Sequence, residues 1–593
     1  MRQSSLTLAA LAARLASADV QLLTSVEQFN SLDEEHHGFP QQTFRSSSII
    51  APVFQVNAWD QSLTEDSPPY IFIGSVYGHE GAGPMILDGK DLSLVYADQQ
   101  YRNAYHSQAQ TINGTQYLTF WEGSHSRGHA NGYCHVVDEQ YNLKYNVTAV
   151  GLDGALADMH EMQITHDDTV IFTTYLNIPW NCTQWGGSED GLLMDSGFQE
   201  VDPATNELLF DWSASHWFDV NDTHARYSPG FGVTDTSGLD FFHINSVQKT
   251  RAGDYLVSSR HLGLLTLISH DDGRPLWTLG GDHSQFEDLS DGRATDFTWQ
   301  HDARFIDADE TTITMFDNHG EHTGACGDTP CLSRGLEIKI DTVAMTAELV
   351  HEYFHPQHVD AGAMGGVQKL PNGNVMTAWG WSPGFVEYTA DGRVAMDVQR
   401  GRLGVDNTPD MFAYRVTRGH WTGRPTWPPS IGVDVTPLGT AANATVYLSW
   451  NGATDVARWG LFVGDDPATI QDMDNYRGVV DKQGFETVAF LGADARGQYV
   501  ACAALDKDDQ VLGASLVWDL ATGQPVVVQS NIASVKSVAQ AASDSSWGLP
   551  SIGICLVAVA GSFVAVAWYC YTRRRRSAGG DVQGEYKPVA SDA

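Results

Sequence analysis

The chain has 593 residues, too many for one ordinary hydrophobic core, so we expect more than one domain. Acidic residues outnumber basic ones by 73 to 34, and the formal charge of −39 argues against nucleic acid or anionic membrane surfaces as partners. Any anionic substrate must then be attracted by a local positive site. Aromatic residues make up 10% of the chain and glycine occurs 57 times, which suits many short strands joined by tight turns.

Residues 1–18 have the pattern of a secretory signal peptide. Arg2 precedes the apolar stretch Leu6–Ala13, and Ala16, Ser17 and Ala18 form a small-residue cleavage site. We therefore expect the rest of the chain to enter the secretory pathway.

Repeated units follow, each with a leading residue, a short hydrophobic run, a polar turn and a strand. The leading residues are His106, His160, His243, His301 and Ala363. A repeat of about 50–60 residues built from strands and turns is typical of β-propeller blades. We predict a six-bladed β-propeller over residues 45–425, in which Tyr70–Ser75 help complete the sixth blade. Equivalent blade positions surround the central channel, so the histidines should converge there.

The region after the repeats predicts a second all-β domain. Segments such as Ala444–Asn451, Ala457–Gly464 and Gly497–Asp506 alternate between apolar and polar residues, as half-buried strands do. We expect a small β-sandwich of the immunoglobulin or fibronectin type at residues 430–525. A stalk rich in Ser, Ala and Gln follows at residues 526–546.

The C-terminal region predicts one transmembrane helix at residues 547–571. No charged residue lies between Ser545 and Thr572, and Arg573–Arg576 follow directly. Residues 572–593 would form a cytosolic tail. This is the topology of a single-pass type I protein of the plasma membrane or of a secretory or vacuolar membrane, with most of the chain extracellular or lumenal.

Glycosylation sequons agree with that topology. They lie at Asn113, Asn146, Asn181, Asn221 and Asn443.

The cysteines outside the expected membrane span suggest two disulfides. Cys326 and Cys331 flank a Gly-Asp-Thr-Pro turn, which favours a local disulfide, and Cys134 with Cys182 is a plausible second pair. Cys502 should be a buried free thiol. No Cys/His spacing typical of zinc appears, so we expect neither a metal nor another cofactor.

The residues expected in the channel have a shared chemistry. Asn245 lies two residues after His243, on the same face of a strand, and Arg260 ends the next strand. Guanidinium, amide and protonated imidazole groups can bind a tetrahedral oxyanion, and a neutral imidazole is a nucleophile. The set favours phosphoryl or sulfuryl transfer through a histidine adduct.

A purely structural interpretation stays open for each of these residues. Propellers carry histidines that only bond neighbouring polar groups, and His106 fits that role best. Arg260 and Asn245 could satisfy backbone groups of the channel. Four further histidines lie in Gly-rich or polar loops, where we expect solvated rings: His125, His129, His319 and His322.

At these motifs the chain resembles the arylsulfotransferase family, in its fungal-type, membrane-anchored branch. The resemblance covers about residues 45–425 and the following sandwich, and HIN, SSRH and WQH occur in the order and spacing of the family. The motifs are DMHE (Asp158–Glu161), FFHINSV (Phe241–Val247), GDYLVSSRH (Gly253–His261), LWTLGG (Leu276–Gly281) and TWQHDARF (Thr298–Phe305). Bacterial members are six-bladed propellers that transfer a sulfuryl group from an aryl sulfate to a phenol, without a nucleotide donor, through a sulfohistidine.

The resemblance implies a role for each channel residue. His301 of WQH becomes the nucleophile, and His160 becomes a further donor or acid/base. His243, Asn245 and Arg260 become the groups that bind sulfate and stabilise charge. A nucleotide donor is disfavoured because Gly89-Lys90 is followed by Asp91 and not by the Ser or Thr of a P-loop.

Two departures from the family leave the function open. The membrane anchor is absent from the bacterial enzymes, and their extra β-domain precedes the propeller. Besides sulfuryl transfer from an aryl sulfate to a phenol, the alternatives are a catalytically silent propeller that binds ligands or partners at the cell surface, and another histidine-dependent transferase or hydrolase of sulfate or phosphate esters.

Overall fold

The computed structural model describes residues 19, 22–35, 40–75, 81–126, 128–225, 238–319, 333–403, 414–438, 441–492 and 497–526. Outside these ranges lie the expected signal peptide, the Cys326–Cys331 pair, His322, nearly all of the stalk, the expected transmembrane helix and the tail. In the described ranges, no helix is both long enough and apolar enough to span a membrane.

The described chain is all-β. It has two α-helices, α2 (Val26–Glu35) and α3 (Gln61–Thr64), both near the N-terminus. Short 3-10 turns occur at Thr183–Trp185, Ala214–His216, Val220–Asp222 and Met473–Asn475.

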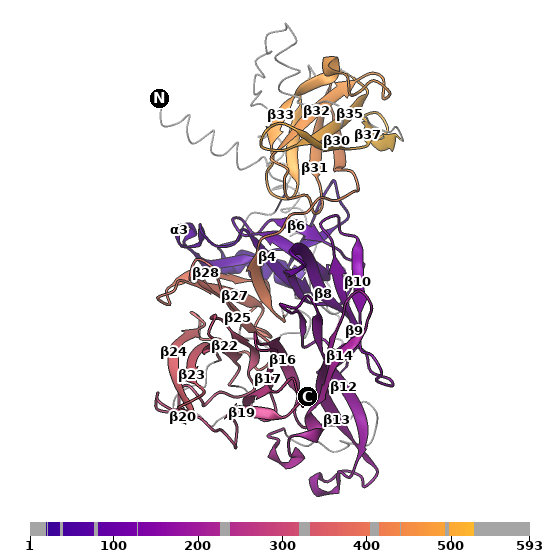
Figure 1. Ribbon diagram of the computed structural model, residues 1–593. Coiled ribbons are helices and arrows are strands. Elements are labelled where there is room, and N and C mark those ends of the chain that lie inside the picture. The colour runs from indigo at the N-terminus through magenta and orange to yellow at the C-terminus, as the bar shows by residue number, and fades with distance from the viewer. Residues whose placement is uncertain are drawn as a thin grey trace, which may run out of the picture.

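Six antiparallel sheets make up the larger part of the described structure (Figure 1). The first joins β29 (Val416–Gly419), β4 (Tyr70–Ser75), β5 (Gly83–Asp88) and β6 (Leu94–Ala97). The second joins β7 (Ala104–Ile112), β8 (Thr115–Ser126), β9 (His129–Val137) and β10 (Leu143–Val147). The third joins β11 (Met162–Ile164), β12 (Val170–Trp180), β13 (Gly191–Val201) and β14 (Leu208–Ser213), with β15 (Leu239–Asp240) parallel to β13.

The remaining three sheets follow the same plan. The fourth joins β16 (Ile244–Lys249), β17 (Tyr255–Ser259), β18 (Leu264–Ile268) and β19 (Pro275–Gly280). The fifth joins β21 (His301–Phe305), β22 (Thr312–Asp317), β23 (Arg334–Asp341) and β24 (Thr346–Phe354), with β20 (Glu287–Asp288) parallel to β24. The sixth joins β25 (Gly366–Lys369), β26 (Val375–Ala378), β27 (Gly384–Tyr388), β28 (Val394–Gln399) and β3 (Gln55–Trp59).

The sheets form a closed, propeller-like ring. Strand β7 contacts β11 and β29, β12 contacts β16, β21 contacts both β16 and β25, and β25 contacts β29. The C-terminal strand β29 pairs with β4 from near the N-terminus, and β3 pairs with β28. The expected participation of Tyr70–Ser75 is therefore seen. No sheet of the ring lacks a neighbour on either side.

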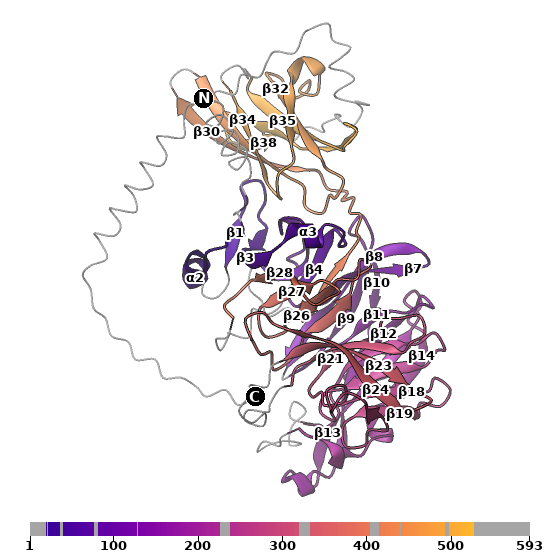
Figure 2. The same cartoon turned by 90° about the vertical axis from the view of Figure 1, so that its left-hand side faces the viewer.

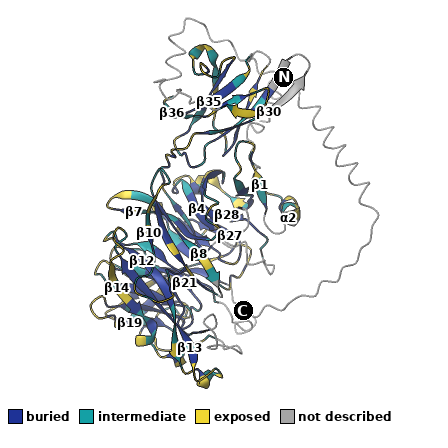
Figure 3. Ribbon diagram, turned by 90° about the vertical axis from the view of Figure 1, so that its right-hand side faces the viewer, coloured by how far each residue is buried: buried dark blue, intermediate teal, exposed yellow. Residues whose placement is uncertain are grey.

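Local sequence explains the individual sheets. The β7–β8 hairpin turns at Asn113-Gly114, where both residues have positive φ (48° and 73°), as a tight hairpin requires. All five residues of β17 are buried, because both faces of this inner strand pack against neighbouring sheets. Figure 3 shows the buried residues running through the strands of the ring. Hydrophobic clusters lie between successive sheets and leave the polar inner ends of the strands to form the site.

A second unit of two sheets follows the ring. One contains β30 (Ser430–Leu438), β31 (Ala441–Ser449) and β34 (Thr487–Leu491). The other contains β33 (Tyr476–Asp481), β32 (Arg458–Gly464), β35 (Tyr499–Leu505), β36 (Val511–Ala514), β37 (Val517–Asp519) and β38 (Gln524–Val526). Residues of both sheets share one core, in which Val446 packs with Trp459 and Cys502.

The N-terminal segment lies between the ring and this second unit (Figure 2). It carries the hairpin β1 (Gln41–Thr43) and β2 (Ile50–Pro52). Phe44 contacts Phe485 with ring centroids 4.5 Å apart, and the Asp19 carboxylate accepts hydrogen bonds from the backbone N–H groups of Phe485 and Glu486. Burial raises the pKa of Asp19 to about 6.

The cysteines differ from expectation in one respect. Cys134 and Cys182 are both free, so the expected disulfide between them is wrong. Cys134 packs with Trp121 between the second and third sheets, whereas Cys182 packs between the third and fourth, with its Sγ near the carbonyl oxygens of Trp180 and Leu192. Cys502 is a buried free thiol, as expected.

Candidate active site

The leading residues of the repeats lie at the inner ends of the innermost strands. The His160 ring meets the His243 ring edge-on, with centroids 4.7 Å apart. The sixth position is taken by Tyr414, just before β29, and its ring lies 4.9 Å from His106, 5.9 Å from His160 and 6.2 Å from His301. Three leading histidines therefore gather around one tyrosine, and the fourth, His243, contacts His160.

Tyr414 has no counterpart in the sequence-based expectations. Only β29 follows Tyr414 in its sheet, because the other strands of that sheet come from the N-terminal region. The sequence after Tyr414 therefore contains one short strand, too little for the repeat to be recognised. The Tyr414 hydroxyl is buried and has no hydrogen-bond partner among the described residues. Burial raises its pKa far above the ordinary range.

His106 is held by both ring nitrogens. Its Nε2 donates to the Met159 carbonyl at 2.6 Å, and its Nδ1 accepts from Arg415 Nη1 at 2.9 Å. Burial and the positive charge of Arg415 lower its pKa well below the ordinary value, so the ring is neutral. These contacts leave the imidazole no free nitrogen, which supports the expected structural role.

His160 is paired with a carboxylate two residues earlier. Its Nδ1 donates to Asp158 Oδ1 at 2.6 Å, and the same oxygen accepts from the His160 backbone N–H and the Thr173 hydroxyl. Burial opposes ionisation of Asp158, but His160 and the backbone N–H donors lower its pKa to about 2. Asp158 is a permanent anion that fixes the His160 ring with Nδ1 protonated.

His243 has a similar carboxylate partner. Its Nδ1 donates to Asp240 Oδ2 at 2.5 Å, and its ring packs against His261 with centroids 4.6 Å apart. His261 donates from Nδ1 to the Asp240 carbonyl at 2.6 Å and accepts at Nε2 from Arg260 Nη1 at 2.9 Å. Burial lowers the pKa of both histidines well below the ordinary value and raises that of Asp240.

His301 differs because its partner is an amide. The ring is buried, and its Nδ1 donates to Asn318 Oδ1 at 2.6 Å, with the Trp299 carbonyl also within 3.0 Å. Nε2 accepts a long hydrogen bond of 3.3 Å from the Met364 backbone N–H. Burial, followed by the positive charge of Arg260, lowers the pKa of His301 well below the ordinary value. The ring is neutral, and its lone pair is on Nε2.

Arg260 and Asn245 are partly engaged by the channel itself. The Arg260 guanidinium lies 4.0 Å over the Trp299 ring, and its Nη2 donates to the Gly362 carbonyl at 3.4 Å. One N–H of the Asn245 amide donates to the Gln300 carbonyl at 2.6 Å, and its buried Oδ1 has no partner among the described residues. Both residues thus satisfy backbone groups, as the structural alternative expected, and Arg260 also acts electrostatically on His243 and His301.

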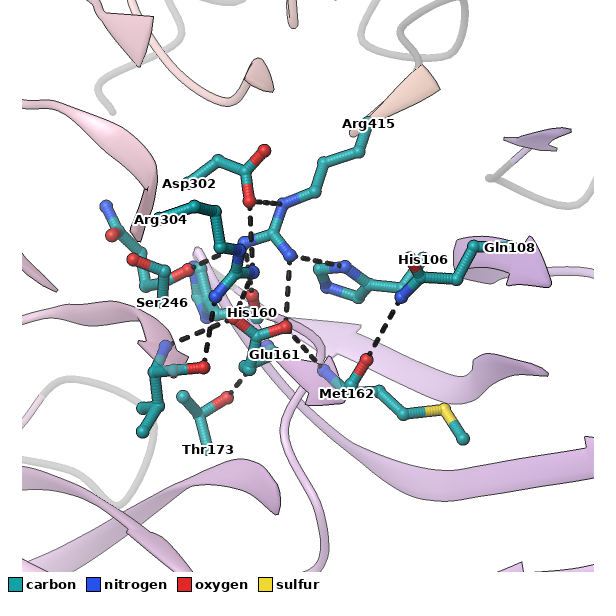
Figure 4. Close-up of polar contacts among 12 residues, drawn as sticks. His106, Gln108, His160, Glu161, Met162, Thr173, Ser246, Asp302, Arg304 and Arg415 are labelled. Carbon is teal, nitrogen blue, oxygen red and sulfur yellow. Dashed lines mark hydrogen bonds and ion pairs between the residues drawn. The ribbon is translucent and has the colours of Figure 1, made fainter. Parts of the chain in front are cut away.

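A buried ion network lies beside these histidines (Figure 4). Glu161 bonds Arg304 Nη2 at 2.5 Å and Arg415 Nη1 at 3.1 Å, and Asp302 bonds the same two guanidinium groups at 3.0 and 3.2 Å. Burial would raise the pKa of Glu161, but Arg304 and Arg415 lower it to about 2. Arg415 also donates to the carbonyls of His160 and Asn245. The network joins several sheets at the ring centre.

The histidines assigned to solvated loops are placed differently. His125 lies on β8 and His129 begins β9, and His129 is buried with its ring 5.9 Å from Tyr175. Burial and His160 lower the pKa of His125 to about 4. His319 bonds Asp317, which raises its pKa. The expectation that these rings are solvated is wrong for His129, because the long β8–β9 hairpin brings it to the site.

Asp240, His243 and His261 have ligand atoms within 4.8 Å of one another and could hold a divalent cation. Both imidazoles, however, already donate from Nδ1 to Asp240, so a cation would have to replace two hydrogen bonds. The described arrangement is a hydrogen-bonded array of Asp240, His243, His261 and Arg260.

The site therefore contains a neutral histidine with an available Nε2 lone pair, an arginine close by, and two histidines backed by carboxylates. Sequence reasoning missed Asp158, Asp240, Asn318 and Tyr414. Acidic residues two or three positions before a leading histidine were the available signal for the first two.

Comparisons with known proteins place this site in context. Residues 108–401 match the family model for arylsulfotransferases (ASST). No protein with a curated description matches the chain.

The solved structures that resemble the chain do so only distantly. One is a protein of unknown function from Bacteroides caccae (12% identity, 59% of this chain and 98% of that chain, TM-score 0.35). Others are an auxiliary nutrient binding protein from Bacteroides thetaiotaomicron (10%, 55% and 64%, TM-score 0.30) and a virginiamycin B lyase from Staphylococcus aureus (9%, 59% and 92%, TM-score 0.26). Likenesses this weak carry no argument about function. The family match runs from within β7 to just beyond β28 and so covers most of the ring, which is just under half of the chain.

Proposed function

We propose that this protein is a membrane-anchored, nucleotide-independent aryl sulfate sulfotransferase of the fungal-type branch, whose six sheets are the blades of one propeller. The observation that carries the proposal is the state of His301. Its Nδ1 is protonated and bonded to Asn318, its Nε2 holds the lone pair, and the positive charge of Arg260 is close by. A neutral nucleophile beside a cation is what attack on an anionic sulfate ester requires.

The reaction proceeds in two displacements. Nε2 of His301 forms a bond to sulfur while the bond between sulfur and the aryl oxygen breaks, and its electron pair leaves with the aryl oxide. The oxygen of a phenol then attacks the same sulfur, and the N–S electron pair returns to Nε2. The aryl oxide leaves as an anion in the first displacement. His160 and His243 each donate Nδ1–H to a carboxylate, so Nε2 of either ring can take the proton of the phenol in the second.

The sulfuryl oxygens need donors in both steps. Arg260 supplies a guanidinium and Asn245 its second amide N–H, and both act on charge that spreads over the oxygens in the transition state. The 3.3 Å hydrogen bond from Met364 to His301 Nε2 must open as sulfur approaches. At this length it is weak, so little free energy is lost when it opens.

A second candidate is the catalytically silent binding propeller. It is favoured by the internal bonding of Arg260 to His261 and Gly362, since each contact reduces what the guanidinium can offer a substrate. In a silent propeller of this kind, the channel would bind an anion without cleaving it.

The deciding experiment incubates the purified protein with a chromogenic aryl sulfate labelled in the sulfuryl group. The wild type should release one equivalent of phenol without an acceptor, and the label should map to the peptide Gln300–Arg304. His301→Ala should release none. Full donor turnover by His301→Ala, or label on another residue, would reject His301 as the nucleophile, whereas absence of phenol release by the wild type would favour the binding propeller.

A further inference from the structure

Asn318 contacts His301 but has no assigned part in the proposed chemistry. It follows β22, and its side chain is almost completely buried, with 2% exposed. Its Nδ2 donates to two backbone carbonyls, Ala361 at 2.7 Å and Met364 at 2.9 Å. Because both amide hydrogens are committed, the orientation of the amide is fixed, and Oδ1 can only accept.

This fixed acceptor determines the protonation of His301. Asn318 Oδ1 and the Trp299 carbonyl both face Nδ1, at 2.6 and 3.0 Å, so Nδ1 must carry the hydrogen. The neutral ring then has its lone pair on Nε2. His106, with its Nε2 bonded to a carbonyl, has the opposite tautomer, so the fold specifies each ring separately.

The amide also differs from the carboxylates that back the neighbouring rings. The carboxylates of Asp158 and Asp240 can stabilise an imidazolium, and so support proton exchange by His160 and His243. Asn318 is uncharged, so its hydrogen bond stabilises a cationic ring less than a carboxylate would. When sulfur bonds to Nε2, the Nδ1 hydrogen stays in place and the ring becomes cationic, which makes it a good leaving group for the second transfer.

Asn318 further links the nucleophile to the segment in front of it. The Met364 carbonyl accepts from Asn318 while the Met364 N–H donates to His301 Nε2. Met364 has a positive φ of 65°, a backbone shape that L residues rarely adopt without support. One amide thus holds both the ring and the backbone that faces its reactive nitrogen.

From these contacts we infer that Asn318 is the positioning residue of His301: it fixes the Nδ1–H tautomer and keeps the sulfohistidine reactive by remaining uncharged. The inference rests on the proposed sulfuryl transfer. Its structural half, the tautomer, can be measured without turnover.

The first test uses the full chain labelled with 15N-histidine. In the wild type, NMR should find His301 protonated at Nδ1 only, with its signals assigned by comparison with His301→Gln. Asn318→Leu should give a mixture of tautomers. Asn374→Leu is the matched control, since that buried amide also donates to a backbone carbonyl but contacts no histidine. An unchanged tautomer in Asn318→Leu would overturn the inference, whether or not the protein is active.

The second test measures phenol release in the first turnover. Asn318→Leu should slow it by about 10- to 10⁴-fold, the upper end being the loss seen when a catalytic histidine adopts the wrong tautomer, while Asn374→Leu should match the wild type. Asn318→Asp should be active at low pH, where the acid form retains one donor and one acceptor. As pH rises, the introduced carboxyl group ionises and is repelled by the carbonyl oxygens of Ala361 and Met364, so the activity relative to wild type should fall. A pH-independent ratio, or a wild-type rate in Asn318→Leu, would refute the inference; absence of turnover in the wild type would instead refute the proposed function and the kinetic half with it.

Discussion

Arg415 donates a hydrogen bond from Nη1 to Nδ1 of His106, and so joins the last strand of the ring to the second sheet. The bond is buried and lies next to the ion network around Glu161. It gives this histidine at a repeated channel position a structural contact that its equivalents, for which we propose a part in the chemistry, do not make.

His106→Ala should therefore reduce stability but not chemistry. Removing the ring leaves a buried Arg415 donor without its partner, which costs about 1–3 kcal/mol. Urea unfolding should report this loss, while the turnover of correctly folded enzyme stays within about twofold of the wild type. His166→Ala, whose ring is 45% exposed, is the control and should change neither quantity. A large loss of turnover at unchanged stability would contradict the structural role of His106.

Glu161→Gln should remove an acid-dependent part of the stability. The folded pKa of Glu161 is about 2, below the ordinary value of 4.5, so its contribution is fully present above pH 4.5 and is lost as pH falls towards 2. Breaking the buried pairs with Arg304 and Arg415 should cost about 3–5 kcal/mol at neutral pH. The difference in unfolding free energy between wild type and variant should shrink between pH 4.5 and 2. A difference that is constant across this range would show that Glu161 is not held as an anion.

Arg260→Lys should lose most of the activity although the positive charge remains. The guanidinium bonds His261 and Gly362 from two different nitrogens while stacking on Trp299, and an ammonium cannot reproduce this fork. We expect kcat/KM for an aryl sulfate to fall by about 10²–10³-fold, as when a donor to a developing oxyanion is removed. Arg251→Lys, in the exposed turn after β16, serves as the control. Wild-type kcat/KM in Arg260→Lys would mean that charge alone suffices.

Cys134 and Cys182 should react as thiols once the protein unfolds. Alkylation without prior reduction, in denaturant, should modify both residues, and peptide mapping should find no crosslink between them. In the native state both should be protected by burial, which raises the pKa of each. A recovered Cys134–Cys182 disulfide peptide would contradict the free thiols of the structure.

The sequence predicted the repeat architecture well because its evidence is periodic. Leading histidines before hydrophobic runs identified the inner strand ends, and the region of Tyr70–Ser75 was correctly assigned to the closing sheet. The position of Tyr414 was not predicted. Its sheet is assembled from both ends of the ring, so only one short strand, β29, follows Tyr414 in the sequence.

Partners of the site residues were harder to predict, since they depend on side-chain approach between sheets. Nothing local in the sequence indicates that Asn318 would meet His301 with its amide oriented by Ala361 and Met364. His129 was misplaced because the glycines near it suggested a loop, whereas β8 and β9 continue as a long hairpin. The expected disulfide failed because sequence spacing does not reveal which sheet interface a cysteine enters.

The pairing of β29 with β4 and of β3 with β28 has a consequence for biosynthesis. Each of these two adjacent sheets combines strands from the beginning and the end of the ring sequence. Neither sheet can be completed until its C-terminal strand, β28 or β29, has left the ribosome. Until then β3, β4 and β28 expose unpaired edges, which are open to wrong partners. Contacts so distant in sequence form slowly, so the newly made chain must remain protected from aggregation until its two ends meet.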